Sequence, residues 1–248
     1  FGSCAAGVVT KVGKVVSGFC TLIAAVSALS FTAQRAHAEG VFARSGQSPY
    51  AGDGLRPRDV PSPNGKSVVK IEGDRLESAR LEVAGTSNAG APAATPLEGI
   101  EVLPNPEILW SPEGYTFTVT ASGQGVVGWW RTHLYVMDVA GKAQPRDLDS
   151  LVAPWYRTFA KCKYHENANF FAGAWLNGGK ELLLVLAAPD HSNCANMGHF
   201  SGLRVYLPTW IVAEAIPEEE LVERYGDKLG KWFKKVPERR TAEAAVKE

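Results

Sequence analysis

Short apolar and β-branched runs alternate with turn residues from about residue 60 to residue 213, and this pattern predicts strands. A first strand is expected in each of three places, and a second strand follows each of them after a loop. The first strands span 66–71, 115–120 and 180–185, and the second strands span 78–83, 132–139 and 202–207. We therefore expect a mainly β domain over 60–213, built from antiparallel sheets.

Each first strand is preceded by a five-residue turn that ends in glycine. The three turns are Pro61–Gly65, Trp110–Gly114 and Trp175–Gly179. Proline presets the first turn position, and glycine supplies a positive φ that other residues tolerate poorly. The strand after such a turn returns antiparallel to the strand before it. The spacing of the units is irregular, so insertions must lie in loops, but a repeat of tens of residues is typical of propellers and similar arrays.

The middle unit carries a family resemblance. Its WSPEG turn (110–114) and its later segment LYVMDVAGKAQPRDL (134–148) resemble one blade of a WD40-like propeller of the TolB type. Such blades have a W-S-P-D-G turn and, after a hairpin, an I-Y-V-M-D segment that ends in glycine. The resemblance, which extends over about 58–213, implies blade-like sheets. It implies less about activity, since these propellers serve as binding scaffolds and as non-catalytic parts of peptidases.

The other two units depart from this pattern. Pro61 stands where the first turn would have tryptophan, and Leu176-Asn177 replaces Ser-Pro in the third turn. Closed propellers also have about 4 to 8 blades, whereas this chain has three turn units. Three arrangements stay open: a partial or degenerate propeller-like set of antiparallel sheets, a propeller that another chain completes, and a β-sandwich or open sheet.

The C-terminal part changes to a helical pattern. We predict one amphipathic helix over 214–237, with Pro217 at its start and carboxylates in its first turn, and a polar tail over 238–248. Apolar residues recur there at three- and four-residue steps: Leu221, Val222, Tyr225, Leu229, Trp232 and Phe233. This stripe either docks on the chain's own sheet or meets a partner or a membrane surface. The residues that would meet a partner are Tyr225, Leu229, Trp232 and Phe233.

The first 38 residues have the features of a secretory signal peptide. Lys11 and Lys14 precede an apolar run, 15–31, and Ala36-His37-Ala38 forms a small-residue exit site. An uncleaved anchor is the alternative, although the run is short for a membrane span, which needs about 20 residues. We expect the mature chain to begin at Glu39 and to be periplasmic or secreted. Residues 39–59 are rich in Gly, Ser, Pro, Arg and Asp, and this composition predicts a flexible linker.

Cleavage would change both the charge and the cysteine count. The mature chain would keep 23 basic and 26 acidic side chains, a net charge of about −3, because the removed segment holds three cations and no anions. This balance lacks the basic footprint of a nucleic-acid-binding protein. Two of the four cysteines, Cys162 and Cys194, would remain. An even count in an exported chain predicts a disulfide between them.

The most polar irregular stretch, 189–199, is a candidate site loop. It contains Asp190, His191, Asn193, Cys194 and His199. A zinc site needs closely paired Cys or His ligands and further ligands, and a disulfide at Cys194 leaves at most two histidines and a carboxylate. We therefore predict no metal and no cofactor, and a disulfide-pinned loop whose side chains bond its own backbone.

Known catalytic motifs are not found in the sequence. Cys162 lies near His165, but an oxidised sulfur cannot act as a nucleophile. The chain has no G-x-S-x-G turn, no P-loop and no dinucleotide-binding glycine pattern. We therefore name no catalytic residue and leave enzymatic activity undecided, with a non-enzymatic protein favoured.

Two aromatic motifs next to arginine are the remaining candidates. Trp129-Trp130-Arg131 and Trp155-Tyr156-Arg157 combine residue types that are common in binding hot spots; alternatively, one aromatic residue of each motif lies in the core. Taken together, the patterns favour an exported binding or scaffold protein that contacts a protein partner or self-associates. Nucleic acid is not expected, and a membrane is expected only through an uncleaved signal or the C-terminal helix. The alternative is an envelope hydrolase, or its accessory propeller domain, with the loop 189–199 at its site.

Overall fold

The computed structural model describes residues 39–49, 58–72, 80–85, 94–97, 106–122, 129–164, 167–190 and 192–234. All of them belong to one structural unit, which spans 37–248. The predicted signal peptide and the predicted polar tail therefore lie outside the described residues. The described part is mainly β, as the strand pattern predicts.

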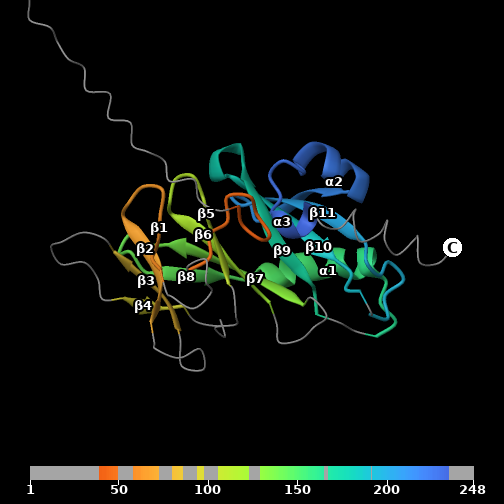
Figure 1. Cartoon of the computed structure of the whole chain (residues 1–248), viewed down its shortest axis with the longest axis horizontal. Coiled ribbons are helices and arrows are strands. Elements are labelled where there is room, and N and C mark those ends of the chain that lie inside the picture. The colour runs from red at the N-terminus through yellow and green to blue at the C-terminus, as the bar shows by residue number, and fades with distance from the viewer. Residues whose placement is uncertain are drawn as a thin grey trace, which may run out of the picture. The chain divides into compact units, whose positions relative to one another are not determined.

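Within these residues the strands form three antiparallel sheets of four strands each, and neighbouring strands follow one another in chain order (Figure 1). Sheet 1 contains β1 (Val60–Pro61), β2 (Ser67–Glu72), β3 (Arg80–Gly85) and β4 (Thr95–Pro96). Sheet 2 contains β5 (Glu107–Trp110), β6 (Thr116–Ser122), β7 (Trp130–Met137) and β8 (Ala143–Arg146). Sheet 3 contains β9 (Phe170–Leu176), β10 (Glu181–Ala187), β11 (Phe200–Tyr206) and β12 (Ile211–Ile216). All six predicted strands are present, with their ends shifted by a few residues.

The three glycine-ended turns occupy equivalent places, each between the first and second strand of its sheet. Gly65 and Gly114 have φ of 67° and 71°, and each donates its N–H to the carbonyl three residues before, that of Ser62 or Ser111, at 2.9 Å. The third turn forms a short 3₁₀ segment, η1 (Asn177–Gly179), in which three consecutive residues have positive φ. The predicted left-handed glycines are therefore confirmed.

The first turn contacts the second, and the second contacts the third, through equivalent residues. The fourth residue of the first turn, Asn64, donates its side-chain N–H to the carbonyl of Glu113 at 2.8 Å. A Cβ at Gly114 would lie 2.7 Å from the Cγ of Asn64. The fourth residue of the second turn, Glu113, likewise reaches over Gly179, where a Cβ would overlap with its carboxylate. The fourth side chain of one turn thus covers the glycine of the next turn.

Two tryptophans link successive sheets through equivalent hydrogen bonds. Trp110 donates its indole N–H to the carbonyl of Val60 at 3.2 Å, and Trp175 donates to the carbonyl of Leu109 at 3.0 Å. Each tryptophan opens a turn unit, and each acceptor is the residue directly before the preceding turn unit. The hydrogen bond that joins sheet 2 to sheet 1 therefore has an equivalent between sheet 3 and sheet 2.

The core has three parts. Between sheets 1 and 2, the ring of Phe117 stacks on Tyr135 with centroids 5.2 Å apart and contacts Trp110 at 4.5 Å. Between sheets 2 and 3, leucines of both sheets pack with helix α1 (Leu148–Ala160). On the other face of sheet 3 lie α2 (Glu218–Tyr225), α3 (Lys231–Lys234) and the segment 39–47 (Figure 1). Because both faces of β10 are covered, all seven of its residues are buried.

The prediction of a flexible linker is wrong for residues 39–49. Phe42 and Ala43 are buried, and the segment pairs with sheet 2 through Gln47 and Ile108. Its anchor is Glu107, a buried carboxylate that accepts the backbone N–H groups of Val41, Phe42 and Ala43. Composition alone does not reveal this contact, because the acceptor lies more than sixty residues away in sequence. We call residues 39–47 the strap.

The helical predictions also need correction. Residues 214–216 belong to β12, and the single helix over 214–237 is replaced by α2 and α3 with a break at 226–230. The break places Gly230 against the strap backbone, where a Cβ would lie 2.5 Å from the carbonyl oxygen of Val41. Helix α1 is not among the sequence predictions, because Pro154 lies in its interior. Asp147 caps it by accepting the N–H of Ser150 at 3.0 Å.

Candidate functional site

A groove lies between sheets 2 and 3, at the end where their glycine-ended turns lie. We call it the turn groove. Its volume is about 850 Å³, which falls in the upper part of the range of ligand pockets, about 300–1,000 Å³. Five segments line it: the β5–β6 turn, the paired β6 and β7 residues, the β8–α1 junction, the η1 turn and the β11–β12 turn.

The walls of the turn groove are largely apolar. On sheet 2, Val136 lies opposite its cross-strand partner Thr116, and the buried Leu134 lies two residues farther in. On sheet 3, Leu207 and Pro208 come from the β11–β12 turn. These residues face the space between the sheets because side chains alternate along each strand, and the opposite face of β6 and β7 packs on sheet 1.

Trp210 closes the β11–β12 turn and has an unusual backbone conformation. Its φ is 57°, and its N–H donates to the carbonyl of Leu207 at 3.2 Å. A left-handed conformation costs a bulky residue about 1–3 kcal/mol and persists only where surrounding packing holds it. The ring is half-buried, packs on the core between sheets 2 and 3, and lines the groove. The turn therefore holds an aromatic ring at the groove at the expense of backbone strain.

The four charged residues at the rim of the groove differ in their contacts. Asp147 is already engaged, because Ser150 donates to it through both hydroxyl and backbone N–H, and these bonds lower its pKa. Glu113 lies over the glycines of η1. Arg146 and Lys180 are exposed, and neither forms an ion pair with another described residue. The rim therefore carries two carboxylates, Glu113 and Asp147, and two cations, one on each sheet.

The predicted disulfide is confirmed, and the loop that contains Cys194 forms hydrogen bonds with the end of helix α1. Cys162 and Cys194 are bonded. Asn193 accepts the N–H of Lys163 at 3.0 Å, and Ala195 donates its N–H to the carbonyl of Lys161 at 3.2 Å. The loop therefore satisfies backbone groups at and just beyond the C-terminal end of α1, which a helix leaves without partners.

The other polar residues of this loop do not gather into a site. His199 contacts Glu218 at 3.1 Å, and the same carboxylate accepts the N–H of Phe200. Asp190 is exposed, and His191 lies outside the described residues. Among the residues that the structure describes, no three His, Cys, Asp or Glu side chains are placed to hold a metal ion.

The two aromatic motifs contribute to different clusters. Trp130 packs against Phe42, Phe171 and Trp232, with ring centroids 4.4–5.6 Å apart. Tyr156 lies in the core between sheets 2 and 3, and Trp155 is 40% exposed on α1. The remaining side chains lie at the surface or half-buried: Trp129, Arg131, which pairs with Asp149 at 3.8 Å, and Arg157. The aromatic rings of the two motifs therefore lie apart, but Arg131 and Arg157 line one cavity of about 390 Å³.

The four predicted partner residues of the C-terminal helix pack against their own chain. Tyr225, Leu229 and Phe233 are buried, and the half-buried Trp232 joins the same cluster on sheet 3. At Gly202, a Cβ would lie 2.9 Å from a methyl group of Leu221. The docked alternative is therefore the one observed, and these side chains are not available to a partner in this state.

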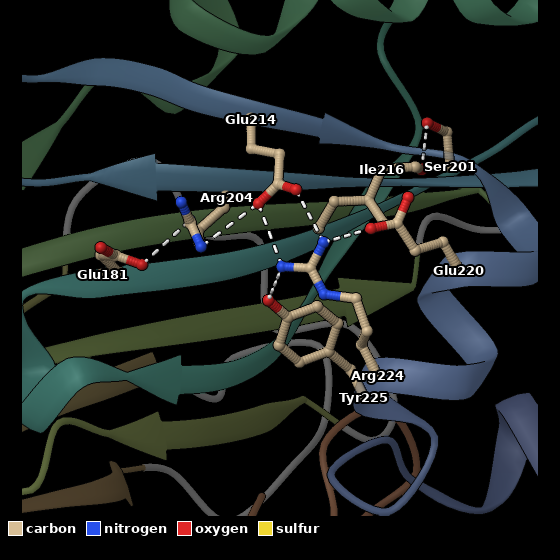
Figure 2. A network of polar contacts seen from close by, with 8 residues as sticks. All are labelled: Glu181, Ser201, Arg204, Glu214, Ile216, Glu220, Arg224 and Tyr225. Carbon is tan, nitrogen blue, oxygen red and sulfur yellow. Dashed lines mark hydrogen bonds and ion pairs between the residues drawn. The ribbon is translucent and has the colours of Figure 1, made fainter.

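A polar network fixes α2 to sheet 3 (Figure 2). Arg224 donates to both oxygens of Glu214 at 2.7 and 3.1 Å, and also to Glu220 and the Tyr225 hydroxyl. These bonds lower the pKa of Glu214. Arg204 lies between Glu214 and Glu181, at 3.2 and 3.1 Å, although its contact with Glu181 is an ion pair without an aligned hydrogen bond. Three carboxylates and two guanidinium groups are all paired within the chain, so the network acts as a structural clamp.

Sequence reasoning did not identify the turn groove. Its signals in the sequence are the turns themselves: the WSPEG turn, the Asn-Gly-Gly of η1, and Leu207-Pro208-Thr209-Trp210. Each is interpretable locally as a turn, but only the stacking of sheets 2 and 3 brings them to the same opening.

The chain matches no protein-family model, no curated protein and no solved structure. Within the described residues, no helix is both long and apolar enough to cross a membrane.

Proposed function

We propose that this protein is an exported binding or scaffold protein that holds a segment of a protein partner in the turn groove. The observation that carries the proposal is the groove itself: apolar walls, a strained tryptophan and unpaired cations meet in one opening of about 850 Å³. Binding sites are typically concave and mostly apolar with a few placed polar groups.

The sheet geometry supports a scaffold. Three sheets with the same strand order and the same tryptophan link give a rigid support for the turns, and binding residues are often found on loops held by such a support. The repeated step also supports a propeller-like relation between the sheets, in line with the resemblance of the WSPEG unit to TolB-type blades. Such repeats are used as binding scaffolds more than as catalysts.

Export is the second part of the proposal. Disulfides form and persist in oxidising compartments, and the Cys162–Cys194 bond joins the end of α1 to the β10–β11 loop. The basic and apolar pattern of residues 1–38 supports a signal peptide with a mature start at Glu39. In the loop 189–199, Asn193 and Ala195 bond backbone groups at the end of α1, which supports a structural role for that part of the loop.

Photo-crosslinking in cells tests the proposed function. A photoreactive residue replaces Pro208 at the groove, and in a matched control it replaces Val139, which is fully exposed outside the groove. We expect a discrete adduct with an exported protein from position 208 only, and its loss when Trp210→Ala is added. The proposal fails if position 208 gives no adduct, if position 139 gives the same one, or if the protein is found in the cytoplasm.

A further inference from the structure

The strap is bonded to the rest of the chain from its first residue. Glu39, which directly follows the predicted cleavage point at Ala38, pairs through its side chain with Lys234. The next two carbonyl groups, those of Gly40 and Val41, accept the first two N–H groups of α3 at 3.0 and 2.9 Å. The carbonyl side of the backbone is therefore occupied immediately after the predicted cleavage point.

The N–H side of the same backbone is bonded to a buried carboxylate. Glu107 accepts the N–H groups of residues 41–43, the last of them at 2.7 Å. Phe42 is buried with them, and its ring packs on Phe171 with centroids 5.2 Å apart. Residues 40–43 are therefore bonded on both sides of the backbone, and undocking of the strap breaks these contacts together.

These contacts bear on how a peptidase would reach the predicted cleavage point. Proteolytic cleavage concentrates where the backbone is exposed and poorly held. On the carboxyl side of the bond between Ala38 and Glu39, the backbone groups are already taken by α3 and Glu107. A site that opens only by local undocking is cleaved at a rate that follows the population of the open form, provided that reclosing is fast.

We propose that docking of the strap protects the bond between Ala38 and Glu39, so that residues 1–38, the leader, are removed only while the strap is undocked. The order of the two events then decides the fate of the chain. A chain whose leader is removed first is released, whereas a chain whose strap docks first keeps the leader as an anchor. This inference rests on the export part of the proposed function and adds a step that regulates it.

The test measures cleavage by a purified type I signal peptidase. One substrate is the folded 248-residue chain in detergent, and the other is a synthetic peptide of residues 29–48, which has the same bond without the fold. We expect the peptide to be cleaved at least about tenfold faster than the folded chain, which corresponds to an opening free energy of about 1.4 kcal/mol. N-terminal sequencing of both products should give Glu39.

The decisive variant lies far from the cleaved bond in sequence. A Cβ at Gly230 would lie 2.5 Å from the carbonyl oxygen of Val41, so Gly230→Ala should loosen the strap and speed cleavage of the folded chain toward the rate of the peptide. Gly202→Ala is the matched control, because its Cβ would meet Leu221 and Ile216 instead of the strap. It should keep the rate of the wild-type chain.

A second variant is confined to the strap, and it decides the question if Gly230→Ala does not fold. A Cβ at Gly40 would overlap with the carbonyl oxygen of Ala43 and would lie 2.8 Å from the carboxylate of Glu107. Gly40→Ala should therefore speed cleavage of the folded chain. The same change in the peptide should leave its rate unaltered, which separates undocking from an effect on the peptidase itself.

Three results would overturn the inference. Equal rates for the peptide and the folded wild-type chain would show that docking does not protect the bond. Equal acceleration by Gly202→Ala and Gly230→Ala would assign the effect to general destabilisation. In both cases the export part of the proposed function stands, since the leader is still removed. If the peptide itself is not cleaved, the mature start at Glu39 and this inference fail together, while the adduct at position 208 still tests binding in the groove.

Discussion

Gly114 shows how much a single position in this fold can constrain. Its φ of 71° lies in the left-handed region, and its Cα faces the side chain of Asn64 in the neighbouring turn. Gly65 has nearly the same φ, 67°, but nothing lies within 4 Å of the place where its Cβ would be. The same substitution at Gly65 and at Gly114 therefore separates the cost of a positive φ from the cost of the contact with Asn64.

We predict that Gly114→Val lowers the free energy of unfolding more than Gly65→Val does. Both variants carry the strain of a β-branched residue at positive φ, about 1–3 kcal/mol, but only the first must also displace Asn64. Glu113→Ala, next to it in the same turn, should cost much less. Urea unfolding of the three variants measures the order, and equal losses for both glycines would show that the contact between turns contributes little.

At the scale of an element, a buried carboxylate holds the strap, in addition to the backbone hydrogen bonds that it makes with residues 228–232. Glu107 accepts three backbone N–H groups from the strap, and Gly40 and Gly46 lie so close to it that a Cβ at either would overlap with or crowd the carboxylate. Burial raises the pKa of Glu107 to about 7, and the three N–H donors offset only part of this rise. The protonated form is therefore favoured in the folded protein relative to the unfolded chain.

This raised pKa predicts a pH dependence of stability with a definite sign. The folded chain holds the proton more tightly, so the contribution of Glu107 is complete below the unfolded pKa of 4.5 and is lost as the pH rises to about 7. The change amounts to roughly 3 kcal/mol. Carboxylates with lowered pKa, such as Glu214, act in the opposite direction and below this window.

Urea unfolding between pH 5 and pH 8, with Glu107→Gln as the non-titrating control, measures the effect. As the pH rises, the unfolding free energy of the wild type should fall relative to that of the Glu107→Gln variant. A shift in favour of the wild type would instead show that the three N–H donors stabilise the anion more than burial destabilises it.

At the scale of the whole molecule, the sheets are joined by a repeated link. Trp110 and Trp175 each donate an indole N–H to the carbonyl of the preceding sheet, at 3.2 and 3.0 Å. The same kind of contact, from an indole N–H to the carbonyl directly before the preceding turn, therefore joins both pairs of successive sheets.

We predict that Trp110→Phe and Trp175→Phe destabilise the protein by similar amounts, about 1–3 kcal/mol each. Phenylalanine keeps an aromatic ring but removes the donor and leaves a carbonyl without this bond. The losses in the double variant should depart from additivity, because Trp175 bonds the carbonyl of Leu109, which shares a peptide bond with Trp110. Thermal and urea unfolding provide the measurement, and a loss confined to one variant would show that the two steps are not equivalent.

The sequence by itself determined the local structure of this protein. Alternating strands such as Tyr115–Thr120 and the glycine-ended turns are set by residues that are neighbours in the chain, and all six predicted strands and the left-handed glycines are confirmed. The disulfide followed from the two cysteines that remain after the predicted signal peptide. Each of these features depends on a backbone preference or a count, so no knowledge of distant residues is needed.

Only the tertiary structure decided which distant segments meet. The strap looked like a linker because its polar partners, Glu107 and residues 228–232, are remote in sequence. Helix α1 contains an interior proline, Pro154, which disfavours a helix on local grounds. The turn groove likewise could not be predicted from local sequence, since it exists only where the turns of sheets 2 and 3 are stacked. Long-range packing selects among locally acceptable arrangements, and it places Trp210, Arg146 and Lys180 at one opening.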